Sequence, residues 1–463
     1  MPAVIRPSVA RRLARFVTGL RPDDLPPRVA TQASLLVLDT LGSCLASATM
    51  EFGRAVIEVA GRLGGERESS ILGSPLKAAT ANAVLANGTL AHGLDFDDTR
   101  EDAIVHTGAV AVTTALATAE ARGASGSAAL EAVVAGVEVM CRLGLAAPGA
   151  FHARHFHPTS VTGSFAAAAS AGRLLGLTED QMVHAFGICG SQAGGIIAYL
   201  ADGSWTKRLH PGWAAHAGVV GALLARAGFT GPEAVFEDPH GFYQAFAGGL
   251  EGGRLEPLLE SLGRAWEIEQ LTLKPYPCGS IAQPYMDCAW RLRQRHGLEP
   301  GQIVEIRCAT APGPIPRLWE PLAAKRRPPN GYAAKFSLPY LVAVILVKGA
   351  AGLAEFTDQA VGDEAVLRLA AKVGYEVDPT IDYPRQFVGR VAVTLRDGRL
   401  VEERQDHPRG GPADPLAPEE VESKFRGNAA LLLPAARIEQ VIAGVRGLAA
   451  QPRVAALMDA LAP

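Results

Sequence analysis

The densest group of titratable side chains in the sequence lies between His92 and His106. Five carboxylates occupy eight consecutive positions of this segment, namely Asp95, Asp97, Asp98, Glu101 and Asp102. Carboxylates this close repel one another unless a cation, a base or solvent intervenes. The segment is therefore compatible with magnesium binding, or with acid–base chemistry in which Asp95 orients a histidine or a substrate hydroxyl. It is also compatible with a solvated helix start, where acidic side chains suit the positive end of the helix dipole.

A second group consists of three histidines within six positions, His152, His155 and His157, followed by Pro158. Their spacing matches none of the common zinc patterns, and no neighbouring cysteine or carboxylate completes a site, so no metal site is predicted. An imidazole held by Pro158 in front of a helix would act as a general acid or base near neutral pH. The alternative is a capping loop in which the histidines bond only to backbone groups.

Two lysines stand in turn-like settings, Lys207 in GSWTKRLH and Lys274 in LKPYPCGS. Lysine is scarce in this chain, whose basic residues are mostly arginine. At a domain boundary such lysines can neutralise substrate carboxylates in a cleft of low dielectric constant, where the pairing is stronger than in water. The alternative is that both are ordinary surface lysines.

The elements that must position these groups are mainly helices up to about residue 265. The segments 128–145 and 161–175 are rich in Ala, Leu and Val, which predicts interior helices that approach one another closely. Thr178 and Gln181 have the spacing of a capping box and predict a helix start. Residues 1–269 are therefore expected to form the first part of a large helical domain.

The pattern changes at the turn-forming run 274–277. Apolar residues alternate with polar ones in 303–308 and in 391–395, which predicts strands, and Asp397-Gly398 predicts a hairpin turn. Helical stretches are expected between them, at 338–353 and 363–373. Residues 270–406 are thus expected to form a smaller α+β domain, and 407–463 a linker and helices that return to the first domain, with Pro418 in the first turn of a helix.

Composition limits the class of protein. The 463 residues are 48% hydrophobic with a net charge of −3, which argues against disorder and against a strongly basic nucleic-acid binder. No apolar run reaches the roughly 20 residues of a membrane span, so no membrane partner is expected. The Arg-rich N-terminus is interpreted as a first helix of the mature chain, with the cytoplasm as the expected location. The six cysteines are scattered and predict no disulfide framework.

Several segments, in order, resemble the MmgE/PrpD family, which includes 2-methylcitrate dehydratase, cis-aconitate decarboxylase and iminodisuccinate epimerase. They are LDTLGSCLA, AHGLDFDDT, FHPTSVTGSFAAAAS, GSWTKRLHPGWAAHAG, LKPYPCGS, AAKFSLPY and a closing HPRG…P…KF. The resemblance implies two domains, a large all-α helical domain and an inserted smaller α+β lid domain, with the active site where they meet. It also implies a homodimer that needs no metal or organic cofactor and acts on a small carboxylate.

Position by position, the resemblance implies a site with seven members. We expect His106 and His157 to transfer protons with Asp95 orienting, Lys207 and Lys274 to hold carboxylates, Tyr340 to donate a proton, and Thr99 to bond to substrate. Three positions depart from many relatives: Ser280 and Gln283 stand where an arginine and a histidine are frequent, and Thr107 where proline is.

The expected activity is that of a hydro-lyase resembling 2-methylcitrate dehydratase, acting on a small di- or tricarboxylate. An isomerase resembling iminodisuccinate epimerase is the next alternative, and a cis-aconitate-type decarboxylase the third, because all three reactions can share a carbanion-like intermediate. A magnesium-dependent enzyme like the terpene synthases would instead use Asp97, Asp98 and Asp102. The remaining alternative is a non-catalytic binding protein on an enzyme scaffold.

Overall fold

The computed structural model describes residues 7–201, 203–250, 254–383 and 386–463. The chain divides into two compact units. Unit 1 comprises Met1–Leu271 and Ala417–Pro463, and unit 2 comprises Thr272–Leu416. The middle of the chain therefore forms one unit and both ends form the other. The boundaries expected from the sequence were 269/270 and 406/407.

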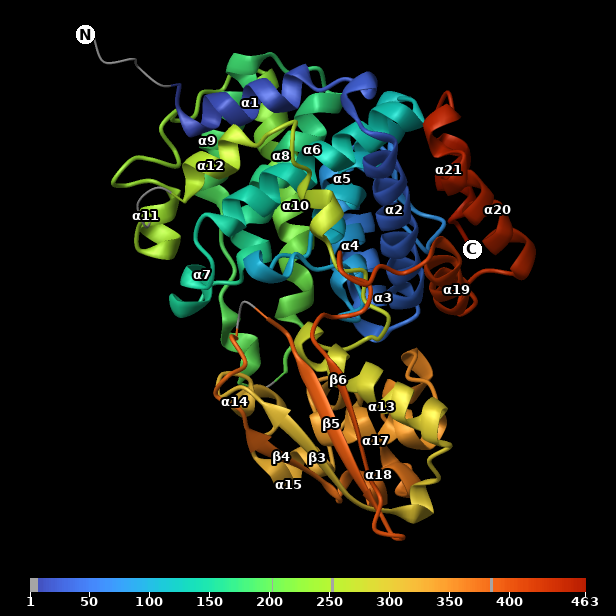
Figure 1. The fold of residues 1–463 in the computed structure, drawn as a ribbon. Coiled ribbons are helices and arrows are strands. Elements are labelled where there is room, and N and C mark those ends of the chain that lie inside the picture. Colours follow the sequence, from blue (N-terminus) through green and yellow to red (C-terminus); the bar gives the residue numbers. More distant parts are fainter. Residues whose placement is uncertain (1–6, 202, 251–253, 384–385) are drawn as a thin grey trace. The chain divides into compact units, whose positions relative to one another are not determined.

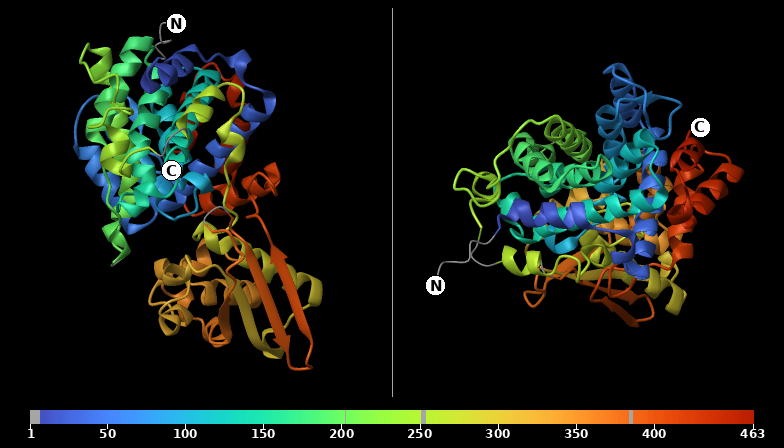
Figure 2. Two further views of the ribbon diagram at one scale, coloured as in Figure 1. Left: turned by 60° about the vertical axis from the view of Figure 1, so that its left-hand side comes forward. Right: turned by 90° about the horizontal axis from the view of Figure 1, so that it is seen from above.

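Unit 1 is built from helices (Figures 1 and 2). The helices at its centre, all largely buried, are α2 (Pro27–Ala48), α4 (Thr80–His92), α5 (Gly108–Arg122), α6 (Gly126–Leu145), α8 (Pro158–Leu174) and α10 (Thr206–Arg226). Helix α10 packs against α4, α5 and α8, and α5 also packs against α4, α6 and α8. The predicted interior helices at 128–145 and 161–175 are confirmed as α6 and α8.

The other elements of unit 1 surround this core. They are α1 (Val9–Gly19), α3 (Glu51–Arg62), α7 (Ala150–Ala153), α9 (Glu179–Gln192), α11 (Phe242–Ala247), α12 (Leu255–Glu260), α19 (Pro418–Ala429), α20 (Ala435–Arg446), α21 (Ala455–Ala460) and the short strands β1 (Ser69–Ser70) and β2 (Lys77–Ala78). The predicted capping box is confirmed at the start of α9, where Thr178 and Gln181 satisfy each other's backbone N–H groups. The predicted first-turn proline is confirmed in α19, which packs against α2.

Helices α4 and α10 cross with almost no side chain between them. A Cβ added to Gly212 would lie 2.1 Å from the carbonyl oxygen of Leu85, and one added to Gly88 would lie 2.8 Å from Cα of Gly212. Glycine at both positions lets the two backbones touch. The crossing fixes how the last turn of α4 lies relative to the first turns of α10.

Helix α2 is long and apolar enough, by length and composition, to cross a membrane. It contains Arg28 and Asp39, so it is not an uninterrupted apolar run of the kind that the sequence was expected to lack. In the structure 72% of its most apolar window is buried within the protein. Helices α4, α5, α6 and α19 cover it, as they would cover a core helix of a globular unit.

Unit 2 contains a four-stranded sheet in the order β4-β3-β5-β6. Its strands are β3 (Ile303–Thr310), β4 (Val373–Val377), β5 (Gly389–Leu395) and β6 (Leu400–Gln405). Strand β3 pairs in parallel with β4 and antiparallel with β5, which forms the predicted hairpin with β6. Helices α13 (Gln283–His296) and α17 (Leu338–Lys348) pack against the sheet (Figure 1). The remaining helices are α14 (Ile315–Leu318), α15 (Leu322–Arg326), α16 (Gly331–Ala334) and α18 (Glu364–Ala370).

Three details of unit 2 differ from the sequence prediction. Val304, expected to face the core, is 51% exposed because the register of β3 shifts between Ile303 and Glu305. Helix α17 ends at Lys348 rather than near 353, since Gly349 adopts a left-handed conformation with φ 77°. Strand β4 was not predicted, because only its first residue is buried and its sequence does not alternate clearly.

Candidate active site

The segment between α4 and α5 is where the predicted acidic cluster lies, and it is buried. Asp97 and Asp98 have no exposed surface, so the interpretation of a solvated helix start is wrong. Asp95 has a positive φ of 56°, a conformation that aspartate tolerates better than most residues. Its Oδ2 lies 3.0 Å from Nζ of Lys207, in the first turn of α10. This ion pair joins the cluster to α10.

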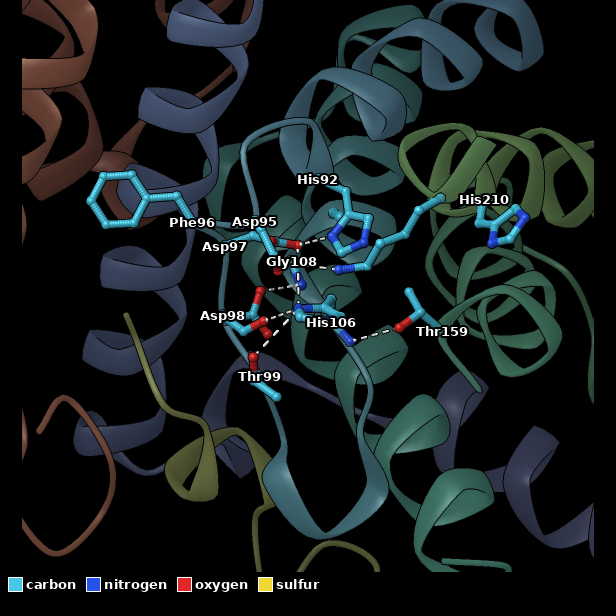
Figure 3. A network of polar contacts seen from close by, with 12 residues as sticks. His92, Asp95, Phe96, Asp97, Asp98, Thr99, His106, Gly108, Thr159 and His210 are labelled. Carbon is cyan, nitrogen blue, oxygen red and sulfur yellow. Dashed lines mark hydrogen bonds and ion pairs between the residues drawn. The ribbon is translucent and has the colours of Figure 1, made fainter. Parts of the chain in front are cut away.

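Asp98 caps α5. Its carboxylate accepts hydrogen bonds from the backbone N–H and the hydroxyl of Thr107 at 2.9 and 2.7 Å, and from the N–H of Gly108 at 2.8 Å (Figure 3). Burial, followed by the charge of Asp97, raises the pKa of Asp98 to about 7, against the effect of these donors. Asp98 therefore holds the start of α5, and Thr107 carries a cap contact that proline could not make through its nitrogen.

The acidic residues of the magnesium alternative have separate partners. Asp97 contacts His92, Asp98 caps α5, and Asp102 is half exposed and pairs with Arg100 at 3.0 Å. A shared magnesium ion would need these oxygens to face one point. The arrangement does not favour a magnesium–diphosphate site.

Two histidines have tautomers that their neighbours determine. His92, the last residue of α4, donates from Nδ1 to the Asp97 carboxylate at 2.8 Å (Figure 3). His106 donates from Nδ1 to the backbone carbonyl of Asp98 at 2.8 Å, and Thr99 Oγ1 lies 3.4 Å from the same nitrogen. A carboxylate and a carbonyl can only accept, so each ring carries a proton on Nδ1. The backbone N–H of His106 donates to Thr159 at 3.1 Å, which ties it to α8.

His157 stands at the N-cap of α8, as the proline after it predicts. Its Nδ1 lies 3.1 Å from Nδ1 of His210 on α10, and its ring centre lies 5.7 Å from that of His92. The pKa of His157 is lowered well below 6.5, first by burial and then by His92, His210, Lys207 and His106. The pKa of His210 is lowered to about 4 by burial and by the charges of His92 and Lys207. Both rings are therefore neutral at pH 7. Of the other two histidines in the sequence cluster, His152 is half-buried and His155 is exposed.

The returning C-terminal segment anchors this loop. Lys424 on α19 donates to the backbone carbonyl of Phe96 at 2.7 Å, lies 3.8 Å from the centre of the Phe96 ring and pairs with Asp39 on α2 at 2.6 Å. A buried ammonium shared in this way is a strong tether. Segments LDTLGSCLA, AHGLDFDDT and KF, far apart in the sequence, thus meet at one lysine.

The structure brings five of the seven expected site residues together in unit 1, namely Asp95, Thr99, His106, His157 and Lys207. Lys274 and Tyr340 belong to unit 2, where Tyr340 donates to the carbonyl of Glu355 at 2.7 Å and burial raises its pKa to about 12. Gln283, one of the departures, donates to backbone carbonyls of Tyr276 and Cys278 within unit 2.

Three members of the cluster, His92, Asp97 and His210, stand in segments that the sequence singled out but were not among the seven expected site residues. His210 follows Lys207 by three positions, which places both on one side of α10, and this spacing could have identified it. His92 and Asp97 are joined through a loop whose left-handed residue turns the chain back, and local spacing does not show that.

Comparison with known proteins gives the lineage of the chain. A model of the MmgE/PrpD N-terminal domain matches residues 11–252, and a model of the MmgE/PrpD C-terminal domain matches residues 276–446. Curated relatives include a cis-aconitate decarboxylase-like protein of Aspergillus oryzae, 28% identical over 97% of this chain and 96% of the relative. The human cis-aconitate decarboxylase is 29% identical over 95% of this chain and 92% of the relative. A cis-aconitate decarboxylase of Aspergillus terreus is 26% identical over 98% of this chain and 96% of the relative. The chain therefore belongs to the MmgE/PrpD family.

Proposed function

We propose that this protein is a carboxy-lyase that removes carbon dioxide from a small unsaturated tricarboxylate of the cis-aconitate type, without a cofactor. The observation that carries this proposal is the buried cluster of His92, His106, His157 and His210 beside the Lys207–Asp95 pair. The names of the relatives support decarboxylation over the hydro-lyase activity that the sequence favoured.

The surroundings of the cluster favour an anionic substrate. His106 lies two residues before α5, His157 caps α8, and Lys207 is the second residue of α10, so three helix starts converge on it. The partial positive charge of each helix N-terminus stabilises an anion, and Lys207 adds a full charge. Acidic side chains near the cluster are already engaged by histidine, lysine or helix caps.

The proposed reaction replaces a carboxylate by a proton. The bond between carbon and the departing carboxylate breaks, carbon dioxide leaves, and the electron pair stays on the substrate, spread onto its remaining carboxylates. Lys207 stabilises that charge. A proton from His157 or His106 then forms the new C–H bond, while Thr99 bonds to substrate and Asp95 orients Lys207.

A neutral His157 in the free protein suits an anionic substrate, because the substrate then supplies the negative charge that favours protonation of the ring. Substrate carboxylates next to His157 favour its protonated form and raise its pKa towards neutrality. The imidazole therefore takes up a proton as the anion binds, and it becomes a general acid only in the complex.

The direct test is proton NMR of small carboxylates with the purified protein in deuterated water, without added metal. We expect carbon dioxide release with one deuterium in the product. Loss of water would support the hydro-lyase alternative, and deuterium exchange without either loss would support the epimerase. Activity that EDTA abolishes would instead support the magnesium alternative.

Variants at the cluster test the residues. We expect His157→Ala and Lys207→Ala each to lower turnover at least 100-fold with little change in melting temperature. His155→Ala, on the exposed histidine two positions before His157, is the matched control and should keep full activity. Turnover of His157→Ala or Lys207→Ala within about threefold of the unmodified protein would contradict the assignment.

A further inference from the structure

Three imidazoles from different parts of unit 1 converge on one point. One nitrogen each of His92, His106 and His157 lies within 4.8 Å of the others. The three side chains are 2%, 6% and 2% exposed, and they come from the end of α4, the loop before α5 and the N-cap of α8. The spacing of His152, His155 and His157 in the sequence did not predict a metal site, and the converging set is a different one.

The Nδ1 nitrogen of each ring has a neighbour within hydrogen-bond distance. His92 Nδ1 is bound to the Asp97 carboxylate, His106 Nδ1 to the Asp98 carbonyl, and His157 Nδ1 to His210. Metal-binding histidines almost always donate their second N–H to a carboxylate or a carbonyl, which orients the ring and raises its basicity. His92 Nε2 is buried and has no hydrogen-bond partner among the described residues.

The ligand atoms of this set determine which kind of ion it can hold. Zinc–nitrogen bonds of about 2.0–2.1 Å at tetrahedral angles place ligand nitrogens about 3.3 Å apart, so the rings must move inward by roughly 1 Å. Three neutral imidazoles favour zinc, cobalt or nickel over magnesium or calcium, which prefer oxygen.

We infer that His92, His106 and His157 form a binding site for a divalent transition metal ion such as Zn²⁺ or Co²⁺, with the fourth position open to water or a carboxylate. His157 then donates from Nδ1 to His210 and binds the ion through Nε2. The binding rests on the geometry alone. A second consequence rests on the proposed function: the ion occupies the nitrogens that would transfer protons, so it inhibits the enzyme.

Cobalt is the probe because its tetrahedral or five-coordinate histidine complexes have visible absorption bands. The full chain, free of any affinity tag and treated with chelator, is titrated with Co²⁺ and then with Zn²⁺. We expect bands that saturate at one Co²⁺ per chain and disappear when Zn²⁺ displaces it. Absence of these bands would overturn the site.

Variants locate the ion. His92→Gln should weaken Co²⁺ binding at least 100-fold. Asp97→Asn keeps all three ligands and should weaken it about 10- to 100-fold, which maintains the test if His92→Gln does not fold. His240→Gln is the matched control, because His240 also pairs with an aspartate, Asp238, but its side chain is 94% exposed. Bands that persist in both cluster variants, or that His240→Gln removes, would overturn the assignment.

Activity measurements separate the two proposals. We expect Zn²⁺ to inhibit at the concentration at which it displaces Co²⁺, and EDTA to restore activity. Cobalt bands in a protein inactive on every carboxylate would support the metal site and contradict the proposed function. Decarboxylation without cobalt bands would support the proposed function and contradict the metal site. Full activity with the metal site occupied would overturn the inhibitory role of the ion.

Discussion

His92 holds its proton on Nδ1 because Asp97, at 2.8 Å, can only accept, and the two side chains are completely buried. The same carboxylate oxygen lies 3.6 Å from Nδ1 of His106. Asp97 therefore acts as a positioning residue for two rings at once. Such a partner matters through the orientation and tautomer of the ring rather than through contact with substrate.

We expect Asp97→Asn to lower kcat about 10- to 100-fold while KM changes less than about threefold, because an amide can donate to His92 Nδ1 and favour the wrong tautomer. Asp97→Glu, which restores the acceptor, should recover part of the loss. Steady-state kinetics on the substrate found by NMR measures both effects. Asp102→Asn is the control, since Asp102 is half exposed and pairs with Arg100. An equal loss in both variants would contradict the positioning role.

The pH profile depends on His157. Decarboxylation consumes a proton, so kcat/KM should rise as pH falls through neutrality and level off only below pH 6.5, where the buried ring becomes protonated. Lys207 is one of the charges that lower this pKa, so its removal raises the pKa and the protonated ring persists to higher pH. We expect Lys207→Met to shift the falling limb to higher pH, on a lower overall kcat/KM. A limb that falls towards acid pH instead would show that His157 acts first as a base, as an epimerase or dehydratase requires.

At the scale of elements, the crossing of α4 and α10 determines where Lys207 and His210 lie relative to His92. A methyl group on Gly212 would meet the Leu85 carbonyl oxygen at 2.1 Å and Thr89 Oγ1 at 2.4 Å. If either helix backbone moved away, the end of that helix would shift as well, which carries His92 in α4 and Lys207 and His210 in α10.

We expect Gly212→Ala to lower the free energy of unfolding by about 1–3 kcal/mol and to reduce kcat/KM at least tenfold, through displacement of α10. Urea unfolding and kinetics measure the two effects. Gly427→Ala is the control: Gly427 is exposed on α19, nothing lies within 4 Å of an added Cβ, and alanine should stabilise the helix by about 0.5–1 kcal/mol. A Gly212→Ala protein as stable and active as the original would show that the helices can separate there freely.

At the scale of the whole molecule, the resemblance to the family implies a homodimer, and large apolar side chains are exposed on and beside α10. Trp205 just before α10, with Leu209 and Trp213 along it, is spaced by four residues and 39–50% exposed. Large apolar side chains grouped in this way mark association surfaces more often than isolated ones do.

We expect light scattering after gel filtration to give twice the mass of one chain for the unmodified protein. The double variant Leu209→Ser, Trp213→Glu should have the mass of one chain, because the two changes remove apolar area and add charge. Leu400→Glu, on a leucine of unit 2 that is 66% exposed, is the control and should leave the mass unchanged. A monomer at micromolar concentrations of the unmodified protein would contradict the expectation.

The two-domain organisation, the helices α6, α8 and α19, the strands β3, β5 and β6 and the capping box of α9 follow from patterns that the sequence displays directly. Such patterns depend on local geometry, a period of two or of 3.6 residues and the needs of helix ends. They fail where a long-range contact overrides them. Val304 became exposed through a register shift, and β4 formed because β3 offered it an edge.

The sequence and its family resemblance named Asp95, Thr99, His106, His157 and Lys207 as expected site residues and favoured proton transfer by imidazole, with lysine holding carboxylates. Only the tertiary structure decided that His92, Asp97 and His210 join them, that Asp98 caps a helix, and that three rings face one point. The physical reason is that protonation states, tautomers and ligand geometry depend on burial and on partners brought together by the crossing of α4, α5, α8 and α10. Some of those partners, such as Asp95 and Lys207, lie more than a hundred positions apart in the chain, so no local pattern of residues reveals them.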